Sequence, residues 1–337
     1  MRIQVNARNR GYEFDALPGE RLLYAGLRAG IDLPYECATG TCGTCKAKAL
    51  AGRVRDGWPQ APGRKYVKPQ AAEFLMCQCA AEEALTLEVS KFVYGMEPGA
   101  CVPETCAGTL RKARRLTHDV IGFALELERP RDFDAGQFAL LAPQGLDGYR
   151  AYSMCNFGRG GRQLDFVIKR KPGGRFSEWL FGADRDGARL ETFGPLGKAT
   201  FDPALGKNLL CIAGGSGIAG MMSILARAAE AKYFDRHKVW VFFGVRTMRD
   251  VFFLDELSAY PKAEITVALS EEDPPADTML RFERGLVHEV AKRAMAGKYQ
   301  NLRAYVAGPP PAVDAAIRVL LLDAKLTTDN IRYDKFS

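Results

Sequence analysis

Hydrophobic and polar positions change their spacing along this chain, and residues 1–97 predict a small domain of strands and one helix. Apolar and polar side chains alternate in two early stretches, which is typical of strands, and Asn9-Arg10-Gly11 between them is a turn sequence. A stretch with helical spacing follows Pro18-Gly19, and Gly30 can end it. The expected elements are strands at 2–7, 12–16, 45–50 and 85–90 and a helix at 20–29.

A linker at residues 98–104, which contains Pro98, Gly99 and Pro103, separates this region from a second pattern. Residues 105–205 contain short alternating stretches separated by turn residues, which predicts a small antiparallel β-barrel domain. The expected elements are strands at 108–116, 119–127, 137–142 and 164–169 and a helix at 177–181.

Residues 206–337 alternate continuous apolar runs with amphipathic stretches. Continuous apolar runs are typical of strands buried on both faces, and the helices between them predict a doubly wound parallel α/β domain. The strands are expected at 208–213, 239–245, 264–269 and 303–307, and the helices at 218–231, 251–260, 286–296 and 312–324.

Composition agrees with a globular chain of more than one domain. The 337 residues are 47% hydrophobic and 26% charged. The N-terminal Met-Arg-Ile-Gln-Val-Asn is too polar for a signal peptide, so we expect a cytoplasmic protein with reduced cysteines. Glycines and serines interrupt the apolar run at 209–226, which therefore predicts a strand, a turn and a helix rather than a membrane span.

Four cysteines have the spacing of a redox centre. Cys37, Cys42 and Cys45 follow C-x4-C-x2-C, and with the distant Cys77 they match the ligand pattern of a plant-type [2Fe–2S] cluster. The small residues between them allow a short loop to wrap a cluster. A structural zinc site and disulfides are the alternatives. Cys79 is a second candidate for the fourth ligand, but Cys77 follows an apolar Phe-Leu-Met run and is favoured.

The chain has only three histidines, His118, His237 and His288. None forms an E-x-x-H or a C-x-H pair, so ligands for a Rieske centre or a carboxylate di-iron site are lacking. Any oxygen chemistry therefore takes place on another protein.

The N-terminal order of elements, with the cysteine loop after the first helix, resembles the β-grasp fold of plant-type ferredoxins. In the second region, Arg150-Ala-Tyr152-Ser153 and the basic turn 169–177 resemble the R-x-Y-S and G-x-x-S motifs of the ferredoxin–NADP reductase superfamily. Phe193-Gly-Pro-Leu-Gly197 resembles the segment that ends the barrel in that superfamily.

These resemblances imply roles for particular residues. Tyr152 would pack on a flavin ring and Ser153 would lie near its reactive nitrogen, which makes them the candidate catalytic residues. Arg150 would face the pyrophosphate, and the C-terminal Phe336 would lie against the flavin. The implied flavin contacts are Arg150, Tyr152, Ser153, Ile168, Lys169, Gly174, Arg175, Ser177 and Phe336.

The third region resembles the nicotinamide domain of the same superfamily. It has the turn Gly214-Gly215-Ser-Gly217, and Arg246 stands at the strand end where dinucleotide folds often have an acid. It departs from the superfamily at Gly220, where Pro is usual, and at Ala307, where Cys is frequent. The implied nicotinamide contacts are Gly214, Gly215, Gly217, Arg246, Gly308 and Pro309.

The whole chain resembles the single-chain NADH reductases of bacterial aromatic-ring oxygenase systems, including those of carbazole dioxygenase and toluene monooxygenase. The Tyr-Glu-Cys37 lead-in and the segment 58–63 contribute to this resemblance. It implies FAD rather than FMN and NADH rather than NADPH. A hydride carries two electrons and a cluster accepts one, so a flavin is expected between them.

The resemblance implies a terminal oxygenase or hydroxylase, either Rieske or di-iron, or a separate ferredoxin as the partner. We expect a monomer and no nucleic-acid or membrane partner. Residues 46–68 hold seven cations against the single acid Asp56, which is either a docking patch or an ordinary solvated face. The alternative functions are a reductase of non-oxygenase metabolism, such as deoxysugar reduction, and a non-catalytic redox sensor.

Overall fold

The N-terminal sheet of the computed structural model, which describes residues 1–276 and 278–335, has the strand order β2-β1-β7-β3-β5. β1 and β7 are parallel, and the other neighbours in this sheet are antiparallel. β4 and β6 form a separate pair. The elements are β1 (Arg2–Ala7), β2 (Gly11–Asp15), α1 (Leu22–Arg28), β3 (Lys46–Ala51), β4 (Val54–Asp56), β5 (Glu73–Leu75), β6 (Cys79–Ala81) and β7 (Leu85–Val89).

Alternation along β1 buries Ile3 and Val5 completely, as the pattern predicted. The helix begins two residues later than expected because Glu20 is engaged in the preceding turn. Its carboxylate accepts the Leu17 N–H at 2.9 Å and pairs with Arg28 at 2.8 Å.

The second sheet is antiparallel, with the strand order β11-β10-β13-β8-β9-β12. The edge strands β11 and β12 are linked by one isolated bridge, between Met154 and Phe166. The sheet therefore curls as the expected barrel does but is only loosely closed, in the form of a half-barrel. Its elements are β8 (Glu104–Arg115), β9 (Val120–Phe133), β10 (Phe138–Pro143), β11 (Arg150–Ser153), β12 (Gly158–Lys169), α2 (Arg175–Gly182) and β13 (Arg189–Leu196). β8 thus begins at the last residue of the expected linker.

The third sheet is parallel throughout, with the order β17-β16-β15-β14-β18-β19. Helices cover both of its faces: α3 and α4 share one buried cluster with it, and α5 and α6 share another. The predicted doubly wound domain is confirmed. Its elements are β14 (Asn208–Gly214), α3 (Ile218–Glu230), β15 (Val239–Val245), α4 (Leu254–Ser258), β16 (Glu264–Leu269), β17 (Arg281–Arg284), α5 (Val287–Ala294), β18 (Leu302–Gly308), α6 (Pro310–Arg318) and β19 (Ile331–Lys335).

The helix predicted at 251–260 is wrong at its start. Phe253 has a left-handed backbone with φ of 63°, so the chain cannot continue from Val251 into a helix. Within the described residues no helix is both long enough and apolar enough to cross a membrane.

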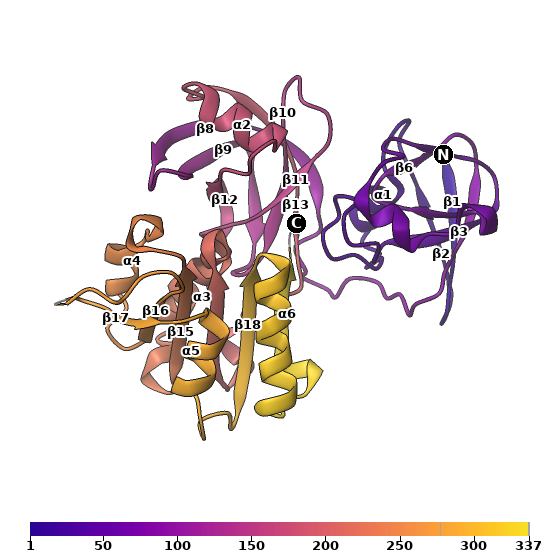
Figure 1. The fold of residues 1–337 in the computed structure, drawn as a ribbon. Coiled ribbons are helices and arrows are strands. Elements are labelled where there is room, and N and C mark those ends of the chain that lie inside the picture. Colours follow the sequence, from indigo (N-terminus) through magenta and orange to yellow (C-terminus); the bar gives the residue numbers. More distant parts are fainter. Residues whose placement is uncertain (277, 336–337) are drawn as a thin grey trace.

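The ferredoxin-like lobe stands to one side of the other two domains but is packed against the barrel (Figure 1). The ring of Tyr24 stacks on Phe193 of β13 at a centroid distance of 4.6 Å. The Gly197 N–H donates to the Tyr35 hydroxyl at 3.0 Å, and Lys198 pairs with Asp32 at 2.7 Å. The buried cluster of the ferredoxin-like core therefore extends into the barrel residues Phe138, Leu140, Phe193 and Leu196.

The last strand reaches the same lobe from the third domain. The Tyr333 hydroxyl on β19 donates to a carboxylate oxygen of Glu36 at 3.3 Å. Glu36 directly precedes the first cysteine of the loop, so the parallel sheet and the cysteine loop are in contact.

Candidate functional site

The four predicted cysteines lie together as two pairs. The sulfur atoms of Cys45 and Cys77 are 3.2 Å apart. The Cys42 thiol hydrogen-bonds to Cys37, and this bond lowers the pKa of Cys37 to about 4, helped by the N–H groups of Thr39 and Thr41. A thiolate is the form that binds iron, and two pairs of thiolates are what two bridged irons require. The residues therefore fit a [2Fe–2S] cluster.

Backbone conformation makes this loop possible. Gly40 and Gly43 have φ values of 90° and 77°, and Ala38 also adopts a left-handed conformation. A Cβ at Gly43 would lie 2.5 Å from the ring of Tyr66, which packs directly over the loop. Only glycine allows both the turn and this close approach.

Cys79, the alternative fourth ligand, is buried on β6 outside the two thiol pairs. Burial, and after it the nearby Asp56, raises its pKa to about 12, although Arg64 acts in the opposite direction. Asp56 is its antiparallel partner on β4. Cys79 therefore lies in a separate environment, whereas Cys77 lies beside Cys45.

A cleft of about 490 Å³ separates the barrel from the carboxyl ends of the parallel strands. Nine of the residues predicted to bind flavin or nicotinamide line it together: Tyr152, Ser153, Lys169, Gly214, Gly215, Gly217, Arg246, Gly308 and Pro309. Ligands bind at this edge of open parallel sheets because loops and helix N-termini converge there.

Close backbone packing shapes the floor of the cleft. A Cβ at Gly217 would lie 2.5 Å from the carbonyl carbon and oxygen of Ala307, so the turn after β14 touches the end of β18. A Cβ at Gly220 on α3 would lie 3.6 Å from the Cβ of Ser153, which is an ordinary contact. The nicotinamide-type domain thus packs directly on the strand that carries the candidate flavin residues.

Tyr152 and Ser153 are held in place by the barrel. Ser153 is only 8% exposed, and the Tyr152 ring lies 5.1 Å from that of Phe176 on α2. Burial raises the pKa of Tyr152, so its hydroxyl stays neutral. The Tyr152 ring can pack against a planar ring system, and the Ser153 hydroxyl can hydrogen-bond to it.

The other predicted flavin residues that the structure describes do not line the cleft. Arg150 donates to the Tyr149 carbonyl at 2.9 Å, and Ile168 is buried in the barrel core. The Ser177 Oγ closes the turn before α2 by accepting the Lys171 N–H at 3.0 Å. Gly174 is the N-cap of that helix, Arg175 is exposed at its first position, and Phe336 lies outside the described residues.

Sequence reasoning missed Asp250, which lines the cleft beside Arg246. The Asp250 carboxylate accepts both the N–H and the hydroxyl of Thr247 at 3.0 Å. The pattern Thr-x-x-Asp is a capping signature and could have indicated this turn. Ser270, Leu286 and Val287 also line the cleft, and no local pattern marks them.

The sequence matches three protein families. Residues 5–82 match the 2Fe-2S iron-sulfur cluster binding domain, residues 107–201 the oxidoreductase FAD-binding domain, and residues 211–318 the oxidoreductase NAD-binding domain. These matches agree with the three sheets of the structure.

Similar proteins match over nearly their whole length. A ferredoxin–NAD(P)+ reductase of Metapseudomonas resinovorans, CarAd, is 37% identical over 94% of this chain and 95% of its own. The xylene/toluene monooxygenase electron transfer component XylA of Pseudomonas putida is 33% identical over 93% and 87%. The solved structure of the ferredoxin reductase in carbazole 1,9a-dioxygenase superposes with a TM-score of 0.87 at 35% identity, covering 100% of this chain and 99% of that one.

The two thiol pairs yield a prediction about the fourth ligand. Replacing Cys77 with Ser should abolish or strongly weaken the visible cluster spectrum, because Cys45 loses its partner sulfur. The matched variant Cys79→Ser should keep that spectrum. Iron and sulfide analysis of both purified variants measures the effect, and the opposite result would assign the ligand to Cys79.

Proposed function

Because this chain belongs to the ferredoxin–NAD(P)+ reductases that combine a 2Fe-2S domain with FAD- and NAD-binding domains, we propose that it transfers electrons from NADH to the oxygenase of an aromatic-ring hydroxylation system. Relatives named as reductase or electron transfer components of carbazole, xylene/toluene and phenol oxygenases support this proposal.

Each cofactor has candidate residues in this proposal. Cys37, Cys42, Cys45 and Cys77 would hold the cluster, Tyr152 and Ser153 would contact the flavin ring, and the glycine turns at 214–217 and 308–309 would hold the dinucleotide. When bound, these groups supply hydride acceptance by FAD and one-electron transfer through the cluster.

The observation that carries the proposal is the shared cleft. Tyr152 and Ser153 of the barrel face the same cavity as Gly217 and Gly308 of the parallel sheet. Ser153 is nearly buried and α3 packs against it, so water is largely excluded at this contact. The chain would therefore contribute to hydride transfer by holding the flavin and nicotinamide rings together in a cavity from which water is partly excluded.

Tyr24 of α1 connects the barrel to the cysteine loop. The Tyr24 hydroxyl donates to the carbonyl of Ala38 within the loop at 2.9 Å, while its ring stacks on Phe193 of β13. Tyr24 is only 5% exposed, and burial raises its pKa, so the hydroxyl remains a neutral donor. This contact fixes the cluster loop relative to the barrel.

The function is tested with the purified protein and its cofactors under anaerobic conditions. We expect one FAD and one [2Fe–2S] cluster per chain, bleaching of both by NADH, and rapid reduction of cytochrome c. The variant Cys77→Ser should lose cytochrome c reduction yet still reduce ferricyanide from the flavin, because the cleft lies in the other two domains.

Three outcomes would contradict the proposal. Zinc in place of iron and sulfide would remove the cluster. A single stoichiometric reduction without turnover would favour a redox sensor. Efficient turnover with a non-oxygenase partner, and none with an oxygenase, would favour the reductase of another metabolic route.

Coenzyme choice depends on the end of β15. Arg246 is 58% exposed there, and its Nε lies 4.0 Å from the Asp250 carboxylate. We propose that NADH is preferred, because the neighbouring carboxylate already offsets the positive charge that a 2′-phosphate would need.

Arg246→Ala should therefore change kcat/KM for NADH less than threefold, since no charged group of NADH needs this side chain. Any residual NADPH activity should fall about tenfold, the size of one lost charge-assisted contact. The matched control is Arg249→Ala, an exposed cation outside the cleft lining. A wild-type preference for NADPH that Arg246→Ala abolishes would refute the NADH proposal.

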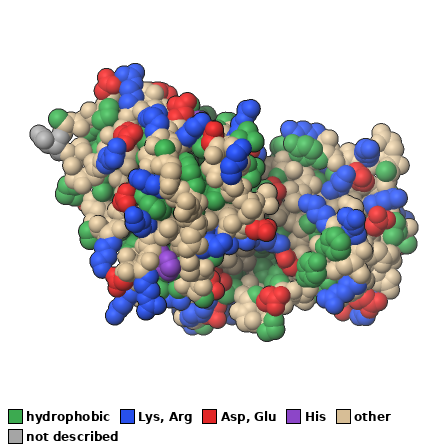
Figure 2. All heavy atoms as spheres, turned by 90° about the horizontal axis from the view of Figure 1, so that it is seen from below, with side chains coloured by type: hydrophobic (Ala, Val, Ile, Leu, Met, Phe, Trp, Pro, Cys, Tyr) green, Lys and Arg blue, Asp and Glu red, His purple; other side chains and the backbone are tan. Residues whose placement is uncertain are grey.

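We propose that the partner docks over the cysteine loop. The structure reduces the number of cations in the basic stretch 46–68 that are free to contact it. Three of its cations are in ion pairs: Lys46 with Glu73, Arg53 with Glu83 and Arg64 with Asp56. The Arg64–Asp56 pair is 2.6 Å long and largely buried, so Arg64 has a structural role. Figure 2 shows cationic and anionic side chains interspersed over this lobe.

Of the four cations outside these pairs, Lys65 and Lys68 flank Tyr66, and we take Lys65, Tyr66 and Lys68 as the candidate docking surface. Tyr66 is 51% exposed while its ring covers Gly43, and the Lys65 ammonium lies 5.0 Å from that ring. Lys68 is exposed two residues further on. An aromatic ring flanked by cations directly above the cluster loop suits an acidic protein surface.

The double variant Lys65→Glu/Lys68→Glu should slow electron transfer to the oxygenase about tenfold at low salt and flatten its salt dependence, because steering charges are reversed. Ferricyanide reduction should not change. The control Lys238→Glu/Lys298→Glu makes the same charge change at exposed positions of the nicotinamide-type domain. Oxygenase turnover that is equal in both double variants at every ionic strength would exclude this surface.

A further inference from the structure

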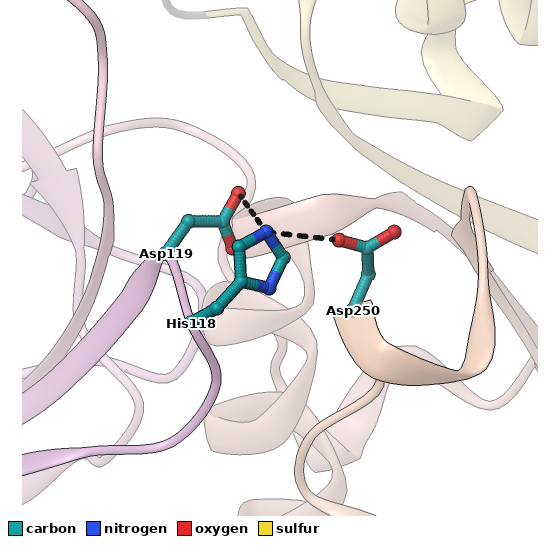
Figure 3. Close-up of side chains that lie close together, drawn as sticks. All are labelled: His118, Asp119 and Asp250. Carbon is teal, nitrogen blue, oxygen red and sulfur yellow. Dashed lines mark ion pairs between the residues drawn. The ribbon is translucent and has the colours of Figure 1, made fainter.

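A histidine and two aspartates meet where the barrel contacts the nicotinamide-type domain. His118 and Asp119 lie in the turn between β8 and β9, and Asp250 lies after β15 in the other domain (Figure 3). The His118 Nε2 is 3.7 Å from the Asp119 Oδ2 and 3.8 Å from the Asp250 Oδ1. The three potential ligand atoms lie within 4.8 Å of one another.

Asp250 gives an independent indication that a ligand belongs at this place. Its side chain is 4% exposed, and its Oδ1 has no hydrogen-bond partner among the described residues. A buried carboxylate oxygen without a hydrogen-bond partner is destabilising, so such atoms are rare in native proteins. Figure 3 shows this oxygen directed at the His118 imidazole.

We propose that His118, Asp119 and Asp250 form a binding site for a divalent cation of the zinc class, which bridges the flavin-type and nicotinamide-type domains. Zinc binds one imidazole nitrogen and carboxylate oxygens at about 2.0–2.2 Å, so it can fit among atoms 3.7–3.8 Å apart after small shifts. The imidazole favours zinc over Mg²⁺ and Ca²⁺, which prefer oxygen ligands.

Two features make the site accessible and reversible. The His118 side chain is 38% exposed, which leaves a path for the ion and room for a water ligand. Lys169 donates to the Asp119 Oδ2 at 3.0 Å and would have to release this oxygen when the ion binds. The ion and the Lys169 ammonium therefore compete for Asp119.

This competition connects the site to the cleft. Lys169 and Asp250 both line the cavity between the two domains. A bound ion would free the Lys169 ammonium and tie the β8–β9 turn to the turn after β15. Because the dinucleotide must enter and leave between these domains, the ion should slow NADH oxidation. This consequence rests on the proposed function, whereas binding of the ion does not.

Binding is tested by calorimetric titration of Zn²⁺ into the cofactor-loaded protein and two single variants. His118→Gln removes the nitrogen ligand, and His288→Gln makes the same change at a histidine outside the cluster. Zinc also binds cysteines, but both variants keep all nine of them. We expect the wild type and His288→Gln to bind zinc at this site with the same affinity. In His118→Gln the affinity for zinc should fall at least about 100-fold.

Asp119→Asn provides a second variant and should also weaken the site, and Mg²⁺ at the same concentrations should not bind there. Equal zinc affinity in His118→Gln and His288→Gln would overturn the site and assign all binding to the thiols.

The functional consequence is measured by NADH-driven cytochrome c reduction with and without zinc. Zinc should inhibit the wild type and His288→Gln but not His118→Gln, whose zinc-free activity should equal that of the wild type. Binding without inhibition would refute the effect on NADH oxidation. If the wild type does not oxidise NADH at all, the proposed function fails, but the calorimetry still decides the site.

Discussion

The stacking of Tyr24 on Phe193 joins the cysteine loop to the barrel, and the other contacts of the ferredoxin domain are arranged around it. Tyr24 is nearly buried, and its hydroxyl hydrogen-bonds to the loop backbone at Ala38. Tyr35 and Asp32 contact the end of β13 just beyond Phe193. Because the ring stack and the hydroxyl bond belong to one side chain, the loop cannot move relative to β13 without breaking one of them.

The barrel meets its two neighbours through different kinds of contact. Aromatic rings and an ion pair join the barrel to the ferredoxin domain. Ion pairs also join it to the nicotinamide-type domain, as between Arg114 and Glu256, but beside the cleft the small Ser153 of the barrel meets Gly220 of α3. Rings fill space and fix one orientation, while small residues let backbones approach and leave a cavity beside them. The first interface therefore suits a fixed electron path, and the second suits a cleft that must admit a dinucleotide.

Strands buried on both faces could be predicted from the sequence because their signal is local. The strands at 239–245 and 264–269 have the predicted bounds, since continuous apolar runs mark both of their ends. The sequence pattern did not predict β17 and β19, because charged residues such as Arg281 and Asp334 interrupt them. These two edge strands are stabilised by backbone hydrogen bonds to β16 and β18. Periodicity does not record backbone pairing.

The candidate site could be predicted where spacing carries the chemistry. The cysteine loop and the glycine turns were found because their geometry allows few residue types. The count of cations in the stretch 46–68 overstates its unpaired positive charge, because the partner of Lys46 is Glu73 and that of Arg53 is Glu83, both outside the stretch. The stacking of Tyr24 on Phe193 and the contact of His118 with the Asp250 oxygen each join two domains. The residues in such contacts are far apart in the sequence, so no local pattern records them.

The contact between Tyr333 and Glu36 has a consequence for how this protein is made. The two residues are 297 positions apart, so β19, the strand that meets Glu36, is synthesised long after the cysteine loop. Domains near the N-terminus fold first during translation. The Glu36 carboxylate therefore has no contact with Tyr333 while the ferredoxin domain folds. Delivery of iron and sulfide to the loop can occur during that interval, before β19 reaches Glu36.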